Sequence, residues 1–311
     1  MVVRWQILKG YYTMRIGLID VDSHNFPNLA LMKISAYHKK RGDHVEWWNG
    51  LLHYDIVYKS KIFTDMYSQD DDYCINADKV FKGGTGYDLK NELPYEVEHQ
   101  CPDYELYNIK DKAYGFLTRG CPRKCPFCIV SEKEGNTHTV AELGEWWNGQ
   151  SEIILMDSNI TASKDCEQHF DDLIKSGARI NFEGGLDVRF MSERKCELIN
   201  QMNVSMIHFA WDNYEADTYN RLKQFRPLLQ LDDRHIRVYV LTNFNTTHSQ
   251  DIERVYKLKE LGYDPFVMIY DKPNAPKLTK QLQRWCNNKF IFRSCDRFEN
   301  YKKTEKNTIC S

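Results

Sequence analysis

The chain has 311 residues, of which 42% are hydrophobic and 28% charged, so it can bury the core of about two domains. This composition excludes a disordered chain, and the length excludes a small disulfide-stapled protein. A formal net charge of -2 excludes a global cationic field for nucleic acid, although a local basic patch stays compatible with it.

The start of the chain shows no predicted targeting signal. Residues 1–13 are interpreted as an extension before a second possible start at Met14, and their apolar segment is interrupted by Trp5 and Lys9, unlike a signal peptide. No stretch approaches the ~18 apolar residues of a membrane span. We therefore expect a cytoplasmic protein without a membrane partner. The sequence does not decide whether Met1 or Met14 is the natural start.

Residues 14–108 are predicted to form a small α/β domain. Residues 14–20 are an apolar run typical of a buried strand, and residues 28–41 have helical spacing and end before Gly42. Further strands are expected at residues 45–48 and 55–59. The region is too short for a full doubly wound domain, so a truncated Rossmann-like layer is expected. Its glycine-rich loop at residues 83–87 is predicted to be a turn rather than a phosphate site.

A repeat of strand, loop and helix defines a second predicted domain, residues 109–295, which precedes a tail at residues 296–311. The expected strands are residues 113–118, 152–156, 179–183, 205–210, 236–241 and 265–270. The expected helices are residues 139–147, 164–176, 192–202, 214–225 and 249–261. This alternation predicts parallel crossovers in an open doubly wound sheet or a partial barrel. In both folds, chemistry gathers at the carboxyl ends of the strands.

Three cysteines follow the first of these strands at C-x3-C-x2-C spacing: Cys121, Cys125 and Cys128. Three thiolates on a loop bent by glycine and proline can converge on one metal centre, and basic residues in the loop favour the deprotonated forms. Soft sulfur ligands indicate zinc or an iron–sulfur cluster. Structural zinc needs a fourth ligand, for which His138 is the local candidate. A [4Fe–4S] cluster on three cysteines instead leaves one iron free for chemistry.

The cysteine loop resembles that of the radical S-adenosylmethionine (radical SAM) superfamily. The C-x3-C-x-aromatic-C pattern is present with Phe127 at the aromatic position, and about six βα units follow it. The resemblance implies an α/β fold with a partial (β/α)6 TIM-like barrel and a [4Fe–4S] cluster whose unique iron binds S-adenosylmethionine. It also implies a one-electron reductant of the flavodoxin or ferredoxin type. Reductive cleavage would give a 5′-deoxyadenosyl radical that abstracts hydrogen from a substrate, with Phe127 packed by the adenine.

The segment at residues 14–41 resembles the shortened N-terminal domain of the cobalamin-binding branch of this superfamily. That branch ligates the vitamin through Asp-x-His-x-x-Gly, but here the third position after His24 is Pro27. We therefore expect a shortened domain that does not bind cobalamin.

Further cofactor-binding residues are expected at the carboxyl ends of the second and third barrel strands. The superfamily often has Gly-Gly-Glu after the second strand, where this chain has Met-Asp-Ser-Asn; Asp157 could accept a hydrogen bond from the cofactor ammonium, next to Asn159. After the third strand, Gly184 permits a close backbone approach to a ligand. Glu183 and Arg189 could face the cofactor, or form a structural ion pair. Loss of the Asp157 carboxylate is expected to weaken cofactor binding while barely changing stability.

Two classes of function stay open from the sequence. The favoured class is a radical SAM enzyme acting on a small molecule or peptide, and an RNA- or protein-modifying, methylthiotransferase-like enzyme is the alternative within it. From another class, a zinc-binding interaction protein would use the same three cysteines structurally. The sequence does not specify the substrate, the product, the oligomeric state, or whether S-adenosylmethionine is regenerated, because substrate choice lies in loops that the motif does not determine.

Overall fold

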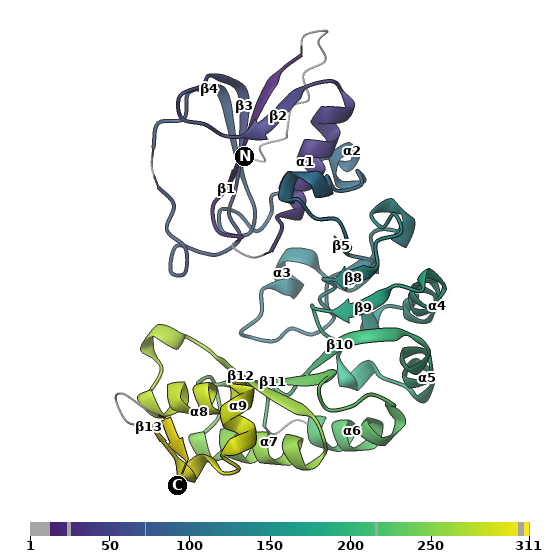
Figure 1. The fold of residues 1–311 in the computed structure, drawn as a ribbon, viewed down its shortest axis with the longest axis vertical. Coiled ribbons are helices and arrows are strands. Elements are labelled where there is room, and N and C mark those ends of the chain that lie inside the picture. Colours follow the sequence, from purple (N-terminus) through teal and green to yellow (C-terminus); the bar gives the residue numbers. More distant parts are fainter. Residues whose placement is uncertain (1–12, 24–25, 72, 215–216, 304–307, 311) are drawn as a thin grey trace. The chain divides into compact units, whose positions relative to one another are not determined.

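The computed structural model describes residues 13–23, 26–71, 73–214, 217–303 and 308–310 (Figure 1). The chain divides into two compact units. The N-terminal unit extends to Gly115 and also contains Ala141–Ser151, and the C-terminal unit contains Phe116–Val140 and continues from Glu152. Residues 1–12 of the expected extension and His24 lie outside the described residues.

The N-terminal unit contains a four-stranded sheet of order β2-β1-β3-β4, in which all paired strands are parallel. The strands are β1 (Arg15–Asp20), β2 (His44–Trp47), β3 (Tyr54–Ser60) and β4 (Ala77–Gly83). The order reverses between β1 and β3, as in doubly wound folds. Strand β4 was not expected from the sequence, because it is a largely exposed edge strand without an alternating apolar face.

Helix α1 (Leu29–Lys40) confirms the helix expected after β1. It begins at Asn28, whose side chain accepts a hydrogen bond from the backbone N–H of Leu31 at 3.2 Å. It ends before Gly42, which has φ +85°. Its apolar face packs on β1 and β3, which buries Leu31 against Ile16. Two short turns follow the sheet: α2 (Tyr95–Glu98) and a 3₁₀ turn at Tyr104–Tyr107.

In the larger sheet, the spatial order of the strands follows their order in the sequence: β12-β11-β10-β9-β8-β5. The strands are β5 (Lys112–Gly115), β8 (Glu152–Leu155), β9 (Arg179–Phe182), β10 (Asn203–Ala210), β11 (Ile236–Thr242) and β12 (Asp264–Ile269). Each pair from β8 to β12 is parallel. An order without reversal is typical of βα barrels rather than of doubly wound sheets, and here the sheet is open.

Helices follow the strands of this sheet and lie along one side of it in Figure 1. They are α4 (Cys166–Ser176), α5 (Glu193–Gln201), α6 (Thr218–Phe225), α7 (His248–Glu260), α8 (Lys277–Asn287) and α9 (Lys289–Ser294). Val267 of β12 packs with Val255 of α7 and Trp285 of α8 in one core cluster. Strands β13 (Tyr301–Lys303) and β14 (Thr308–Cys310) pair near the end of the chain. None of the helices in the described part of the chain has the length and hydropathy needed to cross a membrane.

The helix expected at residues 139–147 is wrong. This segment contains the end of a short strand, β7 (His138–Thr139), and a single 3₁₀ turn at Leu143–Glu145. Glu142 caps that turn and Glu145 reciprocates, but Gly144 within the turn opposes a longer helix.

Candidate functional site

The three cysteines lie in a loop between two short paired strands of the C-terminal unit. Strand β6 (Thr118–Arg119) pairs with β7 in antiparallel fashion, and helix α3 (Val130–Glu134) lies between them in the chain. The backbone N–H of Cys121 donates to the carbonyl of Gly135 at 2.9 Å, and that of Cys128 donates to the carbonyl of Cys125 at 3.0 Å. The first bond ties the start of the eight-residue cysteine segment to the end of α3, and the second forms a turn within the segment.

The start of the cysteine loop is fixed by a glycine and a carboxylate. Gly120 has φ +86°, and an added Cβ would lie 2.4 Å from the carbonyl oxygen of Asn136, so a larger residue does not fit. The Glu134 carboxylate accepts hydrogen bonds from the Gly120 N–H at 2.9 Å and from Arg119 at 3.0 Å. Ser158, just beyond β8, donates to the same carboxylate at 3.3 Å. The loop is therefore tied to the carboxyl end of the second strand.

All three cysteines are free thiols: Cys121 and Cys125 are half-buried and Cys128 is exposed. Partial burial of its thiol raises the pKa of Cys128, and the nearby Cys125 and Cys121 raise it further. No set of three His, Cys, Asp or Glu side chains within the described residues is arranged to hold a single metal ion. A cubane requires something different, because each cysteine binds a different iron at its own corner. His138 is exposed and bonds to the Asn136 carbonyl.

Asp157, expected to meet the cofactor, holds the chain just before the cysteine loop. It is 2% exposed, and its carboxylate accepts hydrogen bonds from the Leu117 N–H at 3.1 Å, the Thr118 N–H at 2.5 Å and the Thr118 hydroxyl at 2.7 Å. Burial raises the pKa of Asp157 to about 6, although the bonds from Thr118 and Leu117 act to lower it. Because both oxygens have protein donors, the expectation that its loss would barely change stability is not compatible with the structure.

Gly184, two residues beyond β9, lies against the backbone that follows β8. An added Cβ would lie 2.1 Å from the carbonyl oxygen of Asp157 and 2.7 Å from that of Met156. The Gly184 N–H donates to the Leu155 carbonyl at 3.2 Å. From the sequence, Gly184 was expected to allow a ligand close to the backbone. In the structure, its lack of a side chain allows the chain that follows β8 to lie close instead.

Replacing Gly184 with alanine is expected to lower the free energy of unfolding by about 2–3 kcal/mol, because the obstructing atoms are backbone and cannot rotate away. Gly144→Ala is the matched control, since no atom lies within 4 Å of the added Cβ. Urea denaturation of both variants measures the difference. Equal stability of the two variants would show that the strand ends separate freely.

Asn159 lies beside Cys121, and Asn159 and Arg189 both contact the Asp187 carboxylate. The Asn159 amide donates to the Cys121 Sγ at 3.2 Å and to the Asp187 carboxylate at 3.5 Å, and its own oxygen accepts from Thr161 at 3.0 Å. Arg189 makes two side-chain bonds to the Asp187 carboxylate, at 2.6 and 2.9 Å. The ion pair anticipated for Arg189 thus forms with Asp187, and Glu183 takes no part in it.

Asp212, two residues beyond β10, is a site residue that the sequence reasoning did not select. Burial raises its pKa to about 6, although Arg254 and Arg189 act to lower it. Arg254 is fully buried and donates to the carbonyls of Trp211 at 2.5 Å and Leu241 at 2.6 Å, which joins the ends of β10 and β11. The position of Asp212 directly after a strand was the only signal available in the sequence.

Phe127, expected to pack by an adenine, lies against aromatic residues that follow β11 and β12. Its ring meets Phe244 edge-on, with centroids 5.4 Å apart, and Phe244 meets Tyr270 in the same way at 5.0 Å. Phe127 is half-buried, so part of its ring is open to a ligand.

Glu183 lies in a separate group from the cysteine loop. Its carboxylate accepts a hydrogen bond from the Asn181 amide at 3.1 Å. It is close enough to His208 and Tyr239 to act on the pKa of both side chains. The structure therefore brings Asn159 to Cys121 and Asp157 to the residues just before the loop, and it places Gly184 against the Asp157 carbonyl. Glu183 lies toward the middle strands.

The fold is similar to that of a radical S-adenosylmethionine methyltransferase, TsrM from Kitasatospora setae. With cobalamin and a [4Fe–4S] cluster bound, that enzyme aligns with a TM-score of 0.61 at 10% identity, over 83% of this chain and 75% of TsrM. With tryptophan substrate and a SAM analogue, the TM-score is 0.63 at 10% identity, over 82% and 72%. No protein-family model and no curated sequence matches the chain. The likeness shows that this chain has the fold of a radical SAM enzyme.

The glycine-rich loop of the N-terminal unit packs on the chain's own backbone at the carboxyl edge of its sheet. Added Cβ atoms at Gly84 and Gly86 would each lie 2.3 Å from a backbone oxygen, of Lys61 and of Phe63 respectively. The buried Asp22 carboxylate accepts the Phe63 N–H at 2.8 Å. The glycines and the carboxylate thus serve the chain's own backbone at the edge where α/β sheets bind ligands.

Proposed function

We propose that this protein is a radical SAM enzyme that binds a [4Fe–4S] cluster through Cys121, Cys125 and Cys128. The observation that carries the proposal is the place of the cysteine loop, which follows the first strand of an unreversed βα sheet and is tied to Ser158 and Asn159 beyond the second. When bound, the cluster and S-adenosylmethionine supply a 5′-deoxyadenosyl radical for hydrogen abstraction from a substrate.

The side chains of the loop are suitable ligands for an iron–sulfur cluster. Its three thiols are soft ligands, and three of them leave one iron of a cubane without a protein ligand. The Asn159 amide already donates to the Cys121 sulfur at 3.2 Å. Hydrogen bonds to ligand sulfurs are among the contacts that set a cluster's reduction potential, so we assign Asn159 to tuning the cluster as well as to the cofactor.

For S-adenosylmethionine we propose Arg189, Gly184 and Phe127 beside the cluster. Arg189 uses Nε and Nη2 on Asp187, and its Nη1 has no partner among the described residues, so it can bind the cofactor carboxylate. The half-buried ring of Phe127 offers a face to the adenine. Gly184 is exposed and has no side chain, so we propose that its backbone contacts the cofactor on the side away from the Asp157 carbonyl.

Asp157 and Glu183 take other roles in this proposal. Asp157 orients the strand that leads into the cysteine loop, because its oxygens are occupied by Leu117 and Thr118. Glu183 faces Asn181 and the middle of the sheet.

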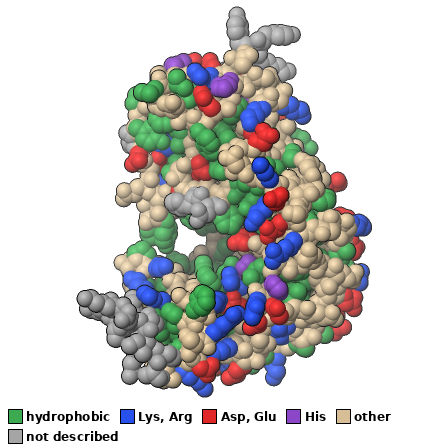
Figure 2. Space-filling model, in the orientation of Figure 1, with side chains coloured by type: hydrophobic (Ala, Val, Ile, Leu, Met, Phe, Trp, Pro, Cys, Tyr) green, Lys and Arg blue, Asp and Glu red, His purple; other side chains and the backbone are tan. Residues whose placement is uncertain are grey.

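The open sheet is proposed to be a partial barrel, and the N-terminal unit a shortened relative of a cobalamin-binding domain that binds no cobalamin. We further propose a one-electron reductant of the flavodoxin or ferredoxin type and a reducing, cytoplasmic environment. The nine cysteines whose side chains the structure describes are free thiols, which agrees with such an environment. On the face drawn in Figure 2, cationic and anionic side chains are interspersed, which favours a small-molecule or peptide substrate over nucleic acid.

Anaerobic purification and reconstitution test the proposed function. We expect a brown protein with about four irons per chain, which forms 5′-deoxyadenosine from S-adenosylmethionine after reduction with dithionite. The measurements are iron content, absorbance and liquid chromatography of the nucleoside product. A colourless protein with one zinc per chain would instead identify a zinc-binding interaction protein.

A further inference from the structure

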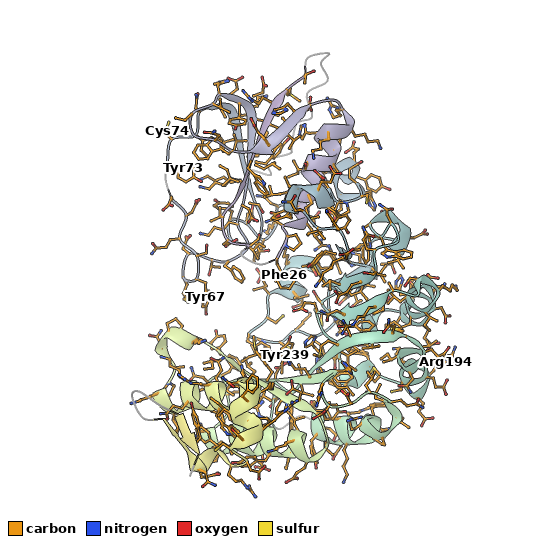
Figure 3. All side chains as sticks on the ribbon, in the orientation of Figure 1. Phe26, Tyr67, Tyr73, Cys74, Arg194 and Tyr239 are labelled. Carbon is orange, nitrogen blue, oxygen red and sulfur yellow. The ribbon has the colours of Figure 1, made fainter. Side chains whose placement is uncertain are left out.

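The face of the larger sheet opposite its helices carries a group of polar and aromatic side chains. Side chains alternate between the two faces along a strand. Because Val267 packs on the helices, its neighbour Phe266 projects to the other face, and the strand register places Tyr239 beside it. Figure 3 shows Tyr239 on the side of the strands away from α6 and α7. We call this group the inner face: Asn181, Glu183, His208, Tyr239 and Phe266.

His208 presents a free acceptor to the inner face. Its Nδ1 lies 2.8 Å from the carbonyl oxygen of Phe182, and because a carbonyl only accepts, Nδ1 carries the hydrogen. The neutral ring then has a lone pair on Nε2, which has no partner among the described residues. His208 is 3% exposed, and burial lowers its pKa, which keeps the ring neutral near pH 7.

Asn181 and Glu183 add two further acceptors. The Asn181 amide nitrogen is used by Glu183, while its buried Oδ1 has no hydrogen-bond partner. The half-buried Glu183 carboxylate has no cationic partner within the described part of the chain. A buried acceptor without a donor and a carboxylate without a cation are both costly, so a ligand that supplies both would be bound favourably.

The other charged side chains near this face form ion pairs, whereas Glu183 does not within the described residues. Arg237 pairs with Asp264 at 3.0 Å, and Lys289 also contacts Asp264. Tyr239 lies parallel to the His208 ring at 5.1 Å between centroids and meets Phe266 edge-on at 5.8 Å. The acceptors without partners therefore lie next to the rings of Tyr239 and Phe266.

We propose that the inner face binds the substrate through a cationic nitrogen group, an ammonium or a guanidinium, whose N–H bonds go to Glu183, Asn181 Oδ1 and His208 Nε2. The body of the substrate lies against the ring of Tyr239. This inference rests on the proposed function, since it assigns the substrate class of that site. It places the substrate cation against β9 and β10, whereas Arg189, assigned to the cofactor, lies in the turn that follows β9.

Ligand-detected NMR titration of the cluster-loaded full chain under argon tests the proposal with benzylamine, benzylguanidine and the uncharged benzyl alcohol. We expect one of the two cations to bind at least tenfold more tightly than benzyl alcohol, and the preferred cation shows whether the site takes an ammonium or a guanidinium. Glu183→Gln keeps the acceptor for Asn181 and should weaken cation binding at least tenfold. Glu167→Gln, an exposed change on α4, should leave it unchanged.

Two variants separate the roles of charge and ring. Tyr239→Leu should weaken the binding of benzylamine more than that of propylamine, because only benzylamine has a ring that can contact Tyr239. If Glu183→Gln does not fold, the preference of the unaltered chain for a cation over benzyl alcohol still tests the proposal. Equal binding of the alcohol, no measurable binding of either cation, or unchanged affinity in folded Glu183→Gln would overturn the proposal.

The outcomes distinguish this inference from the proposed function. If the chain forms 5′-deoxyadenosine but shows no Glu183-dependent cation binding, the inner-face proposal fails alone. If cations bind through Glu183 while the reconstituted chain holds no cluster, the proposed enzyme function fails and the binding site stands.

Discussion

Replacement of Cys125 with serine is expected to abolish cluster binding and with it the formation of 5′-deoxyadenosine. Three cysteines are the fewest that hold a cubane while leaving one iron free, so iron should fall from about four per chain to near zero. The same result is expected for Cys121→Ser and Cys128→Ser. Iron analysis and product chromatography after anaerobic reconstitution provide the measurements.

Cys74→Ser is the matched control for these variants, because Cys74 is an exposed free thiol outside the loop. It should keep full iron and full activity. Loop variants that retain iron and still cleave the cofactor would refute the assignment of the cysteine loop. Circular dichroism would distinguish variants that lose iron because they unfold from folded variants that lose only the cluster.

Asp157→Ala is expected to lower the free energy of unfolding by about 3 kcal/mol and to disorder the entry to the cysteine loop. The reason is that two backbone N–H groups and one hydroxyl, all buried, lose their acceptor together. Thermal unfolding of the variant measures the loss, and iron uptake should become incomplete. The exposed Asp233→Ala is the control and should change stability by less than about 0.5 kcal/mol.

The stability of the chain is also expected to depend on pH through Asp157. Its folded pKa of about 6 lies above the unfolded value of about 3.9, so the folded carboxyl binds its proton more tightly. This contribution is fully present below about pH 4 and is lost as the pH rises to about 6. The fall should be smaller in Asp157→Asn, which has no proton to lose. Parallel slopes for the two proteins in urea denaturation across this range would contradict the assignment.

Much of the C-terminal unit could be predicted from the sequence because its signals are local. The apolar runs of β8, β10 and β12 and the caps of α5 and α7 are each encoded within a few residues. The cysteine motif is local as well, since its three ligands and the aromatic residue lie within eight positions. These features depend on spacing along the chain and not on distant partners.

The prediction from the sequence was wrong where tertiary contacts compete with the local pattern. The segment at residues 139–147 has Val140, Leu143 and Trp147 at helical spacing. However, Trp146 is buried against Gly115, where an added Cβ would lie 2.3 Å from its ring. That contact needs a glycine far away in the chain, and it fixes a short turn in place of a helix.

The alternation of strands and helices, the cysteine loop and its soft-ligand chemistry all follow from local sequence. Two features depend on tertiary contacts: Asp157 stabilises the fold, and Glu183 lies near His208 and Tyr239. Asp157 meets Thr118 across 39 residues, a contact that follows from how two strands pair. The direction of a side chain at a strand end depends on register and on the neighbouring strand, which no local pattern specifies.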